Sequence, residues 1–250
     1  MTEKQYLDLK HLLPTQHGNV SIDNITFINA LIYMCENGCK WRRLPKEYGN
    51  WHVIYKRYRY WLEKGYIDKL FQALCVQKIS QAEDSVYLLD SMSAPVHPDA
   101  CGALKKEAKQ SIGRSVGGLT TKIHMVCAGL KEAVEFILSP GNSHDAPVGG
   151  ELLECVGYQK QVKYLLMYRA YEDDQTRNLA ASLGFHVVVP PKKNRLNPWD
   201  YDKELYRRRN EVERLFRLIQ GFRRAFCPFD KLDDVYLGFI KIALIFIAIR

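Results

Sequence analysis

After residue 81 the chain carries a series of short apolar segments whose order limits the folds open to it. Three come first, SVYLLDS, TTKIHMVCA and EAVEFILSP, the last two separated by a short turn, which predicts strands in antiparallel succession. KYLLMYR and FHVVVPP then alternate with helical stretches near residues 146–155, 172–183 and 203–220. The order β-β-β-α-β-α-β-α predicts an α/β domain built on a mixed sheet.

Residues 1–80 have helical patterns instead. Within 21–35 the apolar residues recur at helical spacing, and Ser21 is the expected N-cap. WHVIYKRYRYWLEKGYIDKLFQAL predicts two more helices, broken at Gly65. We therefore expect two domains, a helical domain over 1–80 and an α/β domain over 81–250.

The chain is strongly basic, with a formal net charge of +8 and a pI of about 9.0. Residues 1–80 hold twelve Lys and Arg against seven Asp and Glu, so they supply +5 of this charge. Such an excess favours a nucleic-acid partner. The aromatic-rich helix that carries Arg57 and Arg59 suits DNA backbone contact in a helix-turn-helix-like module. The alternative is that its aromatics form a core and its basic residues a solvated face.

Cysteine usage and hydropathy predict a cytoplasmic protein. The seven cysteines are odd in number and scattered, which is typical of reduced thiols. The start of the chain lacks the apolar core of a signal peptide. The apolar stretch at 237–249 is interrupted by Lys241 and is shorter than the ~20 residues that a membrane span needs, so we expect a buried helix and no membrane partner.

The helix expected over 203–220 places four polar residues on one side. Counted from Tyr206, residues Arg209, Glu213 and Gln220 fall within a stripe about 60° wide. Arginine for phosphate and a carboxylate for metal would suit a phosphodiester site. The alternative is a surface helix with ordinary ion pairs of Glu213 with Arg209 or Arg217.

Several stretches resemble the DDE transposases of bacterial insertion sequences, which have an RNase H-like catalytic domain. Their Tyr-Arg-Glu-Lys signature reads Tyr206, Arg209, Glu213 and Gln220 here, with glutamine for the final lysine. The resemblance extends to LLDSMSAPVHPDACGALKKEA, IGRSVGGLTTKIHMV, GNSHDA and RAYEDDQTRNLAASLGFHVVVPPKKNR. GCKWRRLPKEYGNWHVIYKRYRYW resembles the DNA-binding segment of the family, so the likeness covers nearly the whole chain.

The resemblance implies three carboxylates that hold two Mg²⁺ ions. Asp90 matches the first carboxylate and Glu213 the third. The second should stand just before Arg-Ala-Tyr, where this chain has Tyr168. A phenol is neutral at pH 7, so it removes one charge and one bridging ligand from a two-metal site. Asp173 and Asp174 lie beyond the strand end, and we expect them to favour the next helix N-terminus instead of replacing the missing ligand.

Other residues have weaker signals. Lys105, Lys106 and Arg114 lie in a basic, glycine-bearing loop after the first strand, which suits DNA contact or a solvated loop. Histidines 97, 124 and 144 are candidate metal ligands by residue type alone. We expect His124, inside a strand, to be a hydrogen-bonded residue of the interior or of a sheet face. We expect His144 to cap a helix and face the site, without a ligand role for either.

Three functions remain open. The first is an insertion-sequence transposase that binds element-end and target DNA, self-associates on paired ends, and acts at the bacterial nucleoid. The second is a catalytically inactive DNA-binding relic or inhibitor of intact copies. The third is an RNase H-like nuclease of another purpose, which the DNA-binding segment disfavours.

Overall fold

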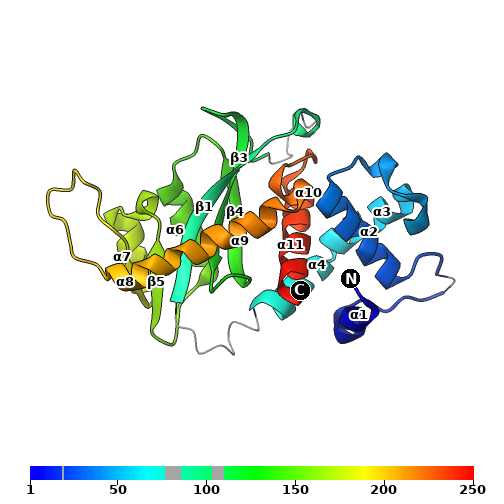
Figure 1. The fold of residues 1–250 in the computed structure, drawn as a ribbon, viewed down its shortest axis with the longest axis horizontal. Coiled ribbons are helices and arrows are strands. Elements are labelled where there is room, and N and C mark those ends of the chain that lie inside the picture. Colours follow the sequence, from blue (N-terminus) through cyan, green and yellow to red (C-terminus); the bar gives the residue numbers. More distant parts are fainter. Residues whose placement is uncertain (19, 77–85, 103–109) are drawn as a thin grey trace. The chain divides into compact units, whose positions relative to one another are not determined.

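The computed structural model describes residues 1–250 apart from 19, 77–85 and 103–109 (Figure 1). By their contacts these residues form two compact units. The first comprises Met1–Gln77, Val96–Gln110 and Leu218–Arg250, and the second comprises Lys78–Pro95 and Ser111–Arg217.

The second unit is a mixed α/β layer structure. Its elements are β1 (Val86–Pro95), β2 (Gly113–Ser115), β3 (Gly118–Cys127), β4 (Ala133–Pro140), α6 (Asp145–Val156), β5 (Lys163–Met167), α7 (Asp174–Ser182), β6 (Phe185–Val188), α8 (Lys203–Tyr206) and most of α9 (Asn210–Gln220). β1 pairs antiparallel with β3 and parallel with β5, and β5 pairs parallel with β6. β4 and the short β2 share the other edge of β3. The predicted RNase H-like mixed sheet is confirmed.

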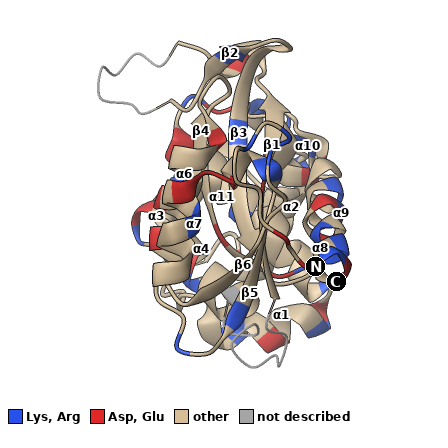
Figure 2. Ribbon diagram, turned by 90° about the vertical axis from the view of Figure 1, so that its left-hand side faces the viewer, with Lys and Arg blue, Asp and Glu red and all other residues tan. Residues whose placement is uncertain are grey.

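Apolar side chains cover both faces of this sheet. Leu89 of β1 and Leu165 of β5 pack with Leu152 of α6 and Ala180 of α7 in one buried cluster. α9 runs along the opposite face, where its residues 212, 215 and 216 are buried (Figures 1 and 2). The sheet therefore forms a layer between α9 and the α6–α7 pair, and residues of β1 can face either side.

Several predicted boundaries differ from the structure. Asp90 does not end the first strand, because β1 continues to Pro95 through antiparallel pairing with β3. The helix predicted over 172–183 begins at 174, because Asp173 caps it. The long helix predicted over 203–220 is interrupted by a 3-10 turn at Arg207–Arg209. β2 was not predicted at all, since three residues carry no periodic signal.

The first unit is helical. Its helices are α1 (Glu3–Leu9), α2 (Asn24–Asn37), α3 (Trp51–Glu63), α4 (Tyr66–Phe71), α10 (Arg223–Phe226) and α11 (Asp233–Ile249), and a π-helical turn covers Gln72–Val76. The break predicted at Gly65 is confirmed, because this residue has a φ of 67° between α3 and α4. The N-cap of α2 is Asp23, not Ser21, since the Asp23 carboxylate accepts the Thr26 amide hydrogen.

Residues from both ends of the chain build this helical unit. The hydroxyl of Tyr58 donates a buried hydrogen bond to the Val235 carbonyl at 2.7 Å. Arg224 is 2% exposed and donates to the Cys39 carbonyl at 2.6 Å, while Asp230 pairs with the same guanidinium. The C-terminal helices thus complete a core that residues 1–77 begin. A functional boundary near residue 80 stays a prediction.

Two further predictions concern cysteine and membrane. The structure describes all seven cysteines, and none of them forms a disulfide. Among the described residues, no helix combines the length and apolar character that crossing a bilayer requires.

Candidate active site

Asp90 is a buried carboxylate in the middle of β1. Asp90 is only 6% exposed, and the Ser91 amide donates a 2.7 Å hydrogen bond to its Oδ1. Burial raises the pKa of Asp90 to about 6, against the lowering effects of that hydrogen bond and of the Arg209 charge. A desolvated carboxylate of this kind gains strongly from a nearby cation.

Tyr168 stands beside Asp90 at the end of β5. Its amide donates to the Leu89 carbonyl at 3.0 Å, which extends the parallel pairing of Leu89 with Met167 by one step. Adjacent strands in register place residues 90 and 168 on the same face of the sheet. Tyr168 is 44% exposed, so its ring lies at the surface of the site. The tyrosine therefore occupies the position beside the first carboxylate.

Arg209 joins the two predicted carboxylates. Its Nη1 donates to Asp90 Oδ2 at 2.6 Å and its Nη2 donates to Glu213 Oε1 at 2.6 Å. Its Cζ lies 5.3 Å from the centre of the Tyr168 ring and 6.0 Å from that of Tyr206. Burial alone would lower the pKa of Arg209, but the bond to Glu213 and the Asp90 charge raise it overall. One guanidinium thus contacts every side chain expected near the metals.

The local fold of this segment explains how the arginine reaches both carboxylates. The 3-10 turn at Arg207–Arg209 is followed by the regular α-helix α9, which has Glu213 four residues after Arg209. Apolar residues of α9 face the sheet and place the adjacent polar stripe beside Asp90 of β1. Glu213 keeps a 45% exposed side chain, and burial raises the pKa of Tyr206. Gln220 is exposed at the end of α9.

The described residues supply donors for one divalent cation more readily than for two. Carboxylate oxygens are the ligands that Mg²⁺ prefers, and Asp90 and Glu213 offer them within the span of one guanidinium. Among the described residues no group of three or more His, Cys, Asp or Glu side chains could hold a metal ion. At the position where the resemblance implies a third carboxylate ligand, this chain has the phenol of Tyr168. This donor set fits a single hard cation that competes with Arg209 for the same oxygens.

Comparison with known proteins places this site in a family. Residues 81–247 match the family described as "Transposase DDE domain", and residues 1–71 match "Putative transposase of IS4/5 family". The chain belongs to the DDE transposase family.

Two relatives of this transposase family member cover parts of it. The chain is 26% identical over 133 residues, 53% of its length, to the whole of a "Putative transposase for insertion sequence element IS6501" of Brucella ovis. It is 31% identical over 81 residues, 32% of its length, to "Uncharacterized protein y4sN" of Sinorhizobium fredii. That second match spans 62% of the Sinorhizobium protein, less than two thirds of its length.

A solved transposase shares the fold. In the structure of a piggyBac transposase synaptic complex with hairpin DNA, the matched part is 10% identical with a TM-score of 0.52. The match covers 98% of this chain and 69% of that one. At such low sequence identity, the structural similarity shows a common fold and nothing more.

The acidic residues after Tyr168 serve the fold of this family member. Asp173 caps α7 by accepting the Thr176 amide and hydroxyl hydrogens at 2.9 and 2.7 Å. Asp174 pairs with Arg195 at 2.7 Å. The expectation that these aspartates favour the helix N-terminus agrees with both contacts. These contacts hold both carboxylates at the start of α7.

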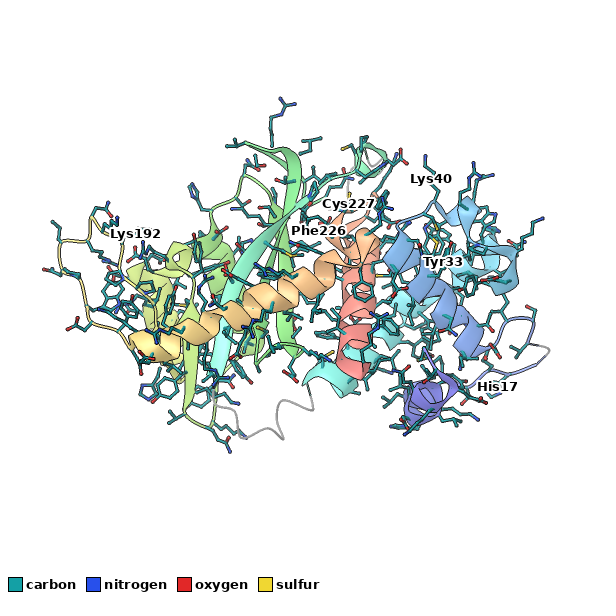
Figure 3. All side chains as sticks on the ribbon, viewed as in Figure 1. His17, Tyr33, Lys40, Lys192, Phe226 and Cys227 are labelled. Carbon is teal, nitrogen blue, oxygen red and sulfur yellow. The ribbon has the colours of Figure 1, made fainter. Side chains whose placement is uncertain are left out.

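The sequence did not reveal a set of ion pairs beside this turn, the Glu172 clamp, in which Glu172 binds Lys192 and Arg195. Glu172 is 4% exposed and pairs with Arg195 at 3.1 Å and with Lys192 at 3.2 Å. Lys192 lies in the loop between β6 and α8 (Figure 3). These contacts join residues about twenty positions apart, so no local pattern could have indicated them.

The histidines do not form a metal centre in the described part of the chain. His124 is fully buried, with Nδ1 2.9 Å from the Tyr171 hydroxyl and Nε2 2.8 Å from the Ser139 hydroxyl. The predicted interior role of His124 is confirmed. His144 is the N-cap residue of α6, as expected, although its side chain makes no capping hydrogen bond. His97 stacks on Phe229 at 4.5 Å.

The basic residues predicted to contact DNA have different surroundings. Arg57 is bonded to the Ile22 carbonyl at 2.9 Å and to Asn24, which favours a role in holding the helical unit together. Arg59 pairs with Asp234 at 3.4 Å. Arg114 is exposed on β2. Lys105 and Lys106 lie outside the described residues. Direct contact of these residues with DNA stays a prediction.

Proposed function

We propose that this chain is an insertion-sequence transposase that binds DNA at element ends, cleaves it and joins it to a target. The observation that carries the proposal is the contact of Arg209 with both Asp90 and Glu213, which brings remote carboxylates together on one face of the sheet in a DDE family member.

Asp90 and Glu213 would hold a divalent cation, Mg²⁺ by its preference for oxygen ligands. Such an ion activates water and stabilises the charge of an in-line phosphodiester displacement. Arg209 bonds to both carboxylates and offsets one of their two negative charges until a cation competes for their oxygens. Tyr206 and Arg209 at the site would then be available to bind the DNA backbone, as would Gln220 farther along α9.

The positive net charge supports double-stranded DNA as the partner. We propose backbone contacts for Arg59, Lys105, Lys106 and Arg114 on the same grounds. The bonds of Arg57 within the helical unit make it the weakest of the predicted DNA contacts. Pairing two element ends would need more than one copy, so we propose a homo-oligomer on DNA at the bacterial nucleoid.

Tyr168 favours a second candidate function for this copy. Its ring stands where the resemblance puts the second carboxylate, and the aspartates that follow, Asp173 and Asp174, are engaged at the start of α7. A protein that binds element ends without cutting them would inhibit intact transposases by joining their assemblies.

A cleavage assay separates the two functions. The substrate is a duplex taken from the DNA that flanks the gene, incubated with Mg²⁺ or Mn²⁺. We expect Tyr168→Asp to cleave at least roughly 100-fold faster than the wild type, because it restores an anionic ligand. Tyr164→Asp is the control, since Tyr164 is a partly exposed tyrosine on the same strand, outside the site.

Each outcome assigns a function. Recovery in Tyr168→Asp alone supports a transposase site disabled in this copy. Equal cleavage by the wild type and Tyr168→Asp shows that the phenol is tolerated, and excludes the inhibitor. If neither protein binds the duplex at any salt concentration, both candidate functions are wrong.

A further inference from the structure

The arginines of residues 207–217 divide into two classes. Arg207 pairs with Glu204 at 2.8 Å, Arg208 pairs with Glu211 at 2.9 Å, and Arg209 joins the site carboxylates. Arg214 and Arg217 are exposed, and within the described part of the chain neither side chain makes a hydrogen bond or ion pair. Both basic and acidic residues lie along α8 and α9 (Figure 2). Only these last two arginines of the segment remain free for an external anion.

The two free arginines differ in direction. α9 is a regular α-helix, so Arg217 lies about 40° around the axis and about 6 Å along it from Glu213. Arg214, one residue after Glu213, points about 100° away. Glu213 engages Arg209 on its N-terminal side. Arg217 therefore continues the stripe of Arg209 and Glu213, whereas Arg214 leaves it.

The same stripe ends in an uncharged residue. Gln220 stands where the signature has lysine, about 20° from Glu213 around the axis and within about 60° of Arg217. A glutamine amide can donate a hydrogen bond to phosphate but adds no charge. The chain thus lacks the signature's positive charge at 220 but has an exposed arginine, Arg217, about one turn earlier on the same side of α9.

We propose that Arg217 binds a backbone phosphate of the DNA strand that enters the carboxylate site, in place of a lysine at 220. The inference rests on the proposed DNA-binding function and makes Arg217 a positioning residue for that strand. A guanidinium forms charge-assisted, often bidentate bonds to phosphate, so the substitution keeps the charge and adds directional contact.

The first test compares two variants of equal charge. Arg217→Ala and Arg214→Ala each remove one exposed, unpaired arginine from α9. Binding to the gene-flanking duplex is measured by mobility shift over a salt series. We expect Arg217→Ala to weaken binding about tenfold and to reduce the slope of log K against log salt by about one, because one phosphate contact is lost. Arg214→Ala should change affinity less than about twofold by the same reasoning.

The second test is rescue. Arg217→Ala combined with Gln220→Lys should recover most of the affinity and the salt slope, since the cation returns to the same side of the helix. Thermal melting of each variant checks that the exposed substitutions leave the fold intact.

The outcomes separate this inference from the proposed function. If the wild type binds and both arginine variants lose affinity equally, or if Gln220→Lys fails to rescue, the role of Arg217 is refuted while DNA binding stands. If the wild type does not bind the duplex, the inference and the proposed function are both wrong.

Discussion

Arg209 holds the two carboxylates of the candidate site together. It neutralises Asp90, whose side chain is nearly inaccessible to water, and holds Glu213 beside it. Without a cation, two carboxylates this close would repel each other, and the buried one would be protonated more readily. The guanidinium therefore stabilises both carboxylates and would compete with a metal ion for their oxygens.

Removing Arg209 should make stability depend on metal. We expect Arg209→Ala to lose roughly 2–3 kcal/mol near pH 7, because a buried charge loses its partner, and the pKa of Asp90 should rise above about 6. Millimolar Mn²⁺ should raise the melting temperature of this variant more than that of the wild type. The control is Arg207→Ala, which breaks an exposed pair with Glu204 three residues earlier. If Mn²⁺ raises the melting temperature of all three proteins equally, Arg209 does not compete with the metal ion for the carboxylates.

His124 should make stability fall in mild acid. Burial lowers the pKa of His124 to about 4 from 6.5, so the unfolded chain takes up a proton as the pH falls through 6.5 while the folded chain does not. The effect is absent above pH 6.5 and reaches about 3 kcal/mol of lost stability near pH 4. Urea unfolding across this range should show a steeper pH dependence for the wild type than for His124→Gln. His186→Gln, at an exposed position on β6, should keep the wild-type dependence.

At the level of elements, the turn between β5 and α7 connects the site to the sheet. Tyr171 is fully buried, and a Cβ at Gly149 would lie 2.4 Å from its ring, so glycine in α6 permits this close packing. The Tyr171 hydroxyl also contacts His124 of β3. The turn that begins at Tyr168 is thus held by α6 and by the sheet.

Capping of α7 gives a test of the role of Asp173. Asp173→Ala should lose about 1 kcal/mol of stability and Asp173→Asn only a few tenths, because asparagine also caps helices. Neither change should alter the Mn²⁺ response of the Tyr168→Asp protein, measured by paramagnetic resonance of bound Mn²⁺. A loss of Mn²⁺ binding in Asp173→Asn would mean that this carboxylate is a ligand after all.

In the whole molecule, the helical unit is assembled from the two ends of the chain. Beyond the bonds of Tyr58 and Arg224, the Cys35 thiol contacts the Phe239 carbonyl and Lys241 pairs with Asp68. Buried bonds of this kind leave unsatisfied groups when one partner is removed.

A fragment of residues 1–80 should therefore fail to fold alone. We expect weak helicity without a cooperative melt by circular dichroism, because α11 supplies much of the apolar surface that the N-terminal helices bury. Adding a peptide of residues 218–250 should raise the helicity. A cooperative thermal transition of the 1–80 fragment alone would contradict this expectation.

Local pattern was sufficient for much of this protein. Strand and helix order from residue 81 onward, the break at Gly65 and the interior place of His124 follow from periodicity and residue type, which are properties of neighbouring residues. Arg209 and Glu213 of the signature do lie together beside Asp90, as does Tyr168, while the roles of these residues stay predictions.

Contacts between distant residues could not be inferred in this way. The bridge of Arg209 from Glu213 to Asp90 joins residues 119 positions apart, and the Glu172 clamp and the Arg224 pair depend on chain paths that no local spacing records. Which arginines of α9 remain unpaired likewise depends on where their acidic neighbours point. Periodicity records the structural preference of a short segment. Which charged side chains pair depends on how the segments pack against one another, because burial sets the strength of each charge interaction.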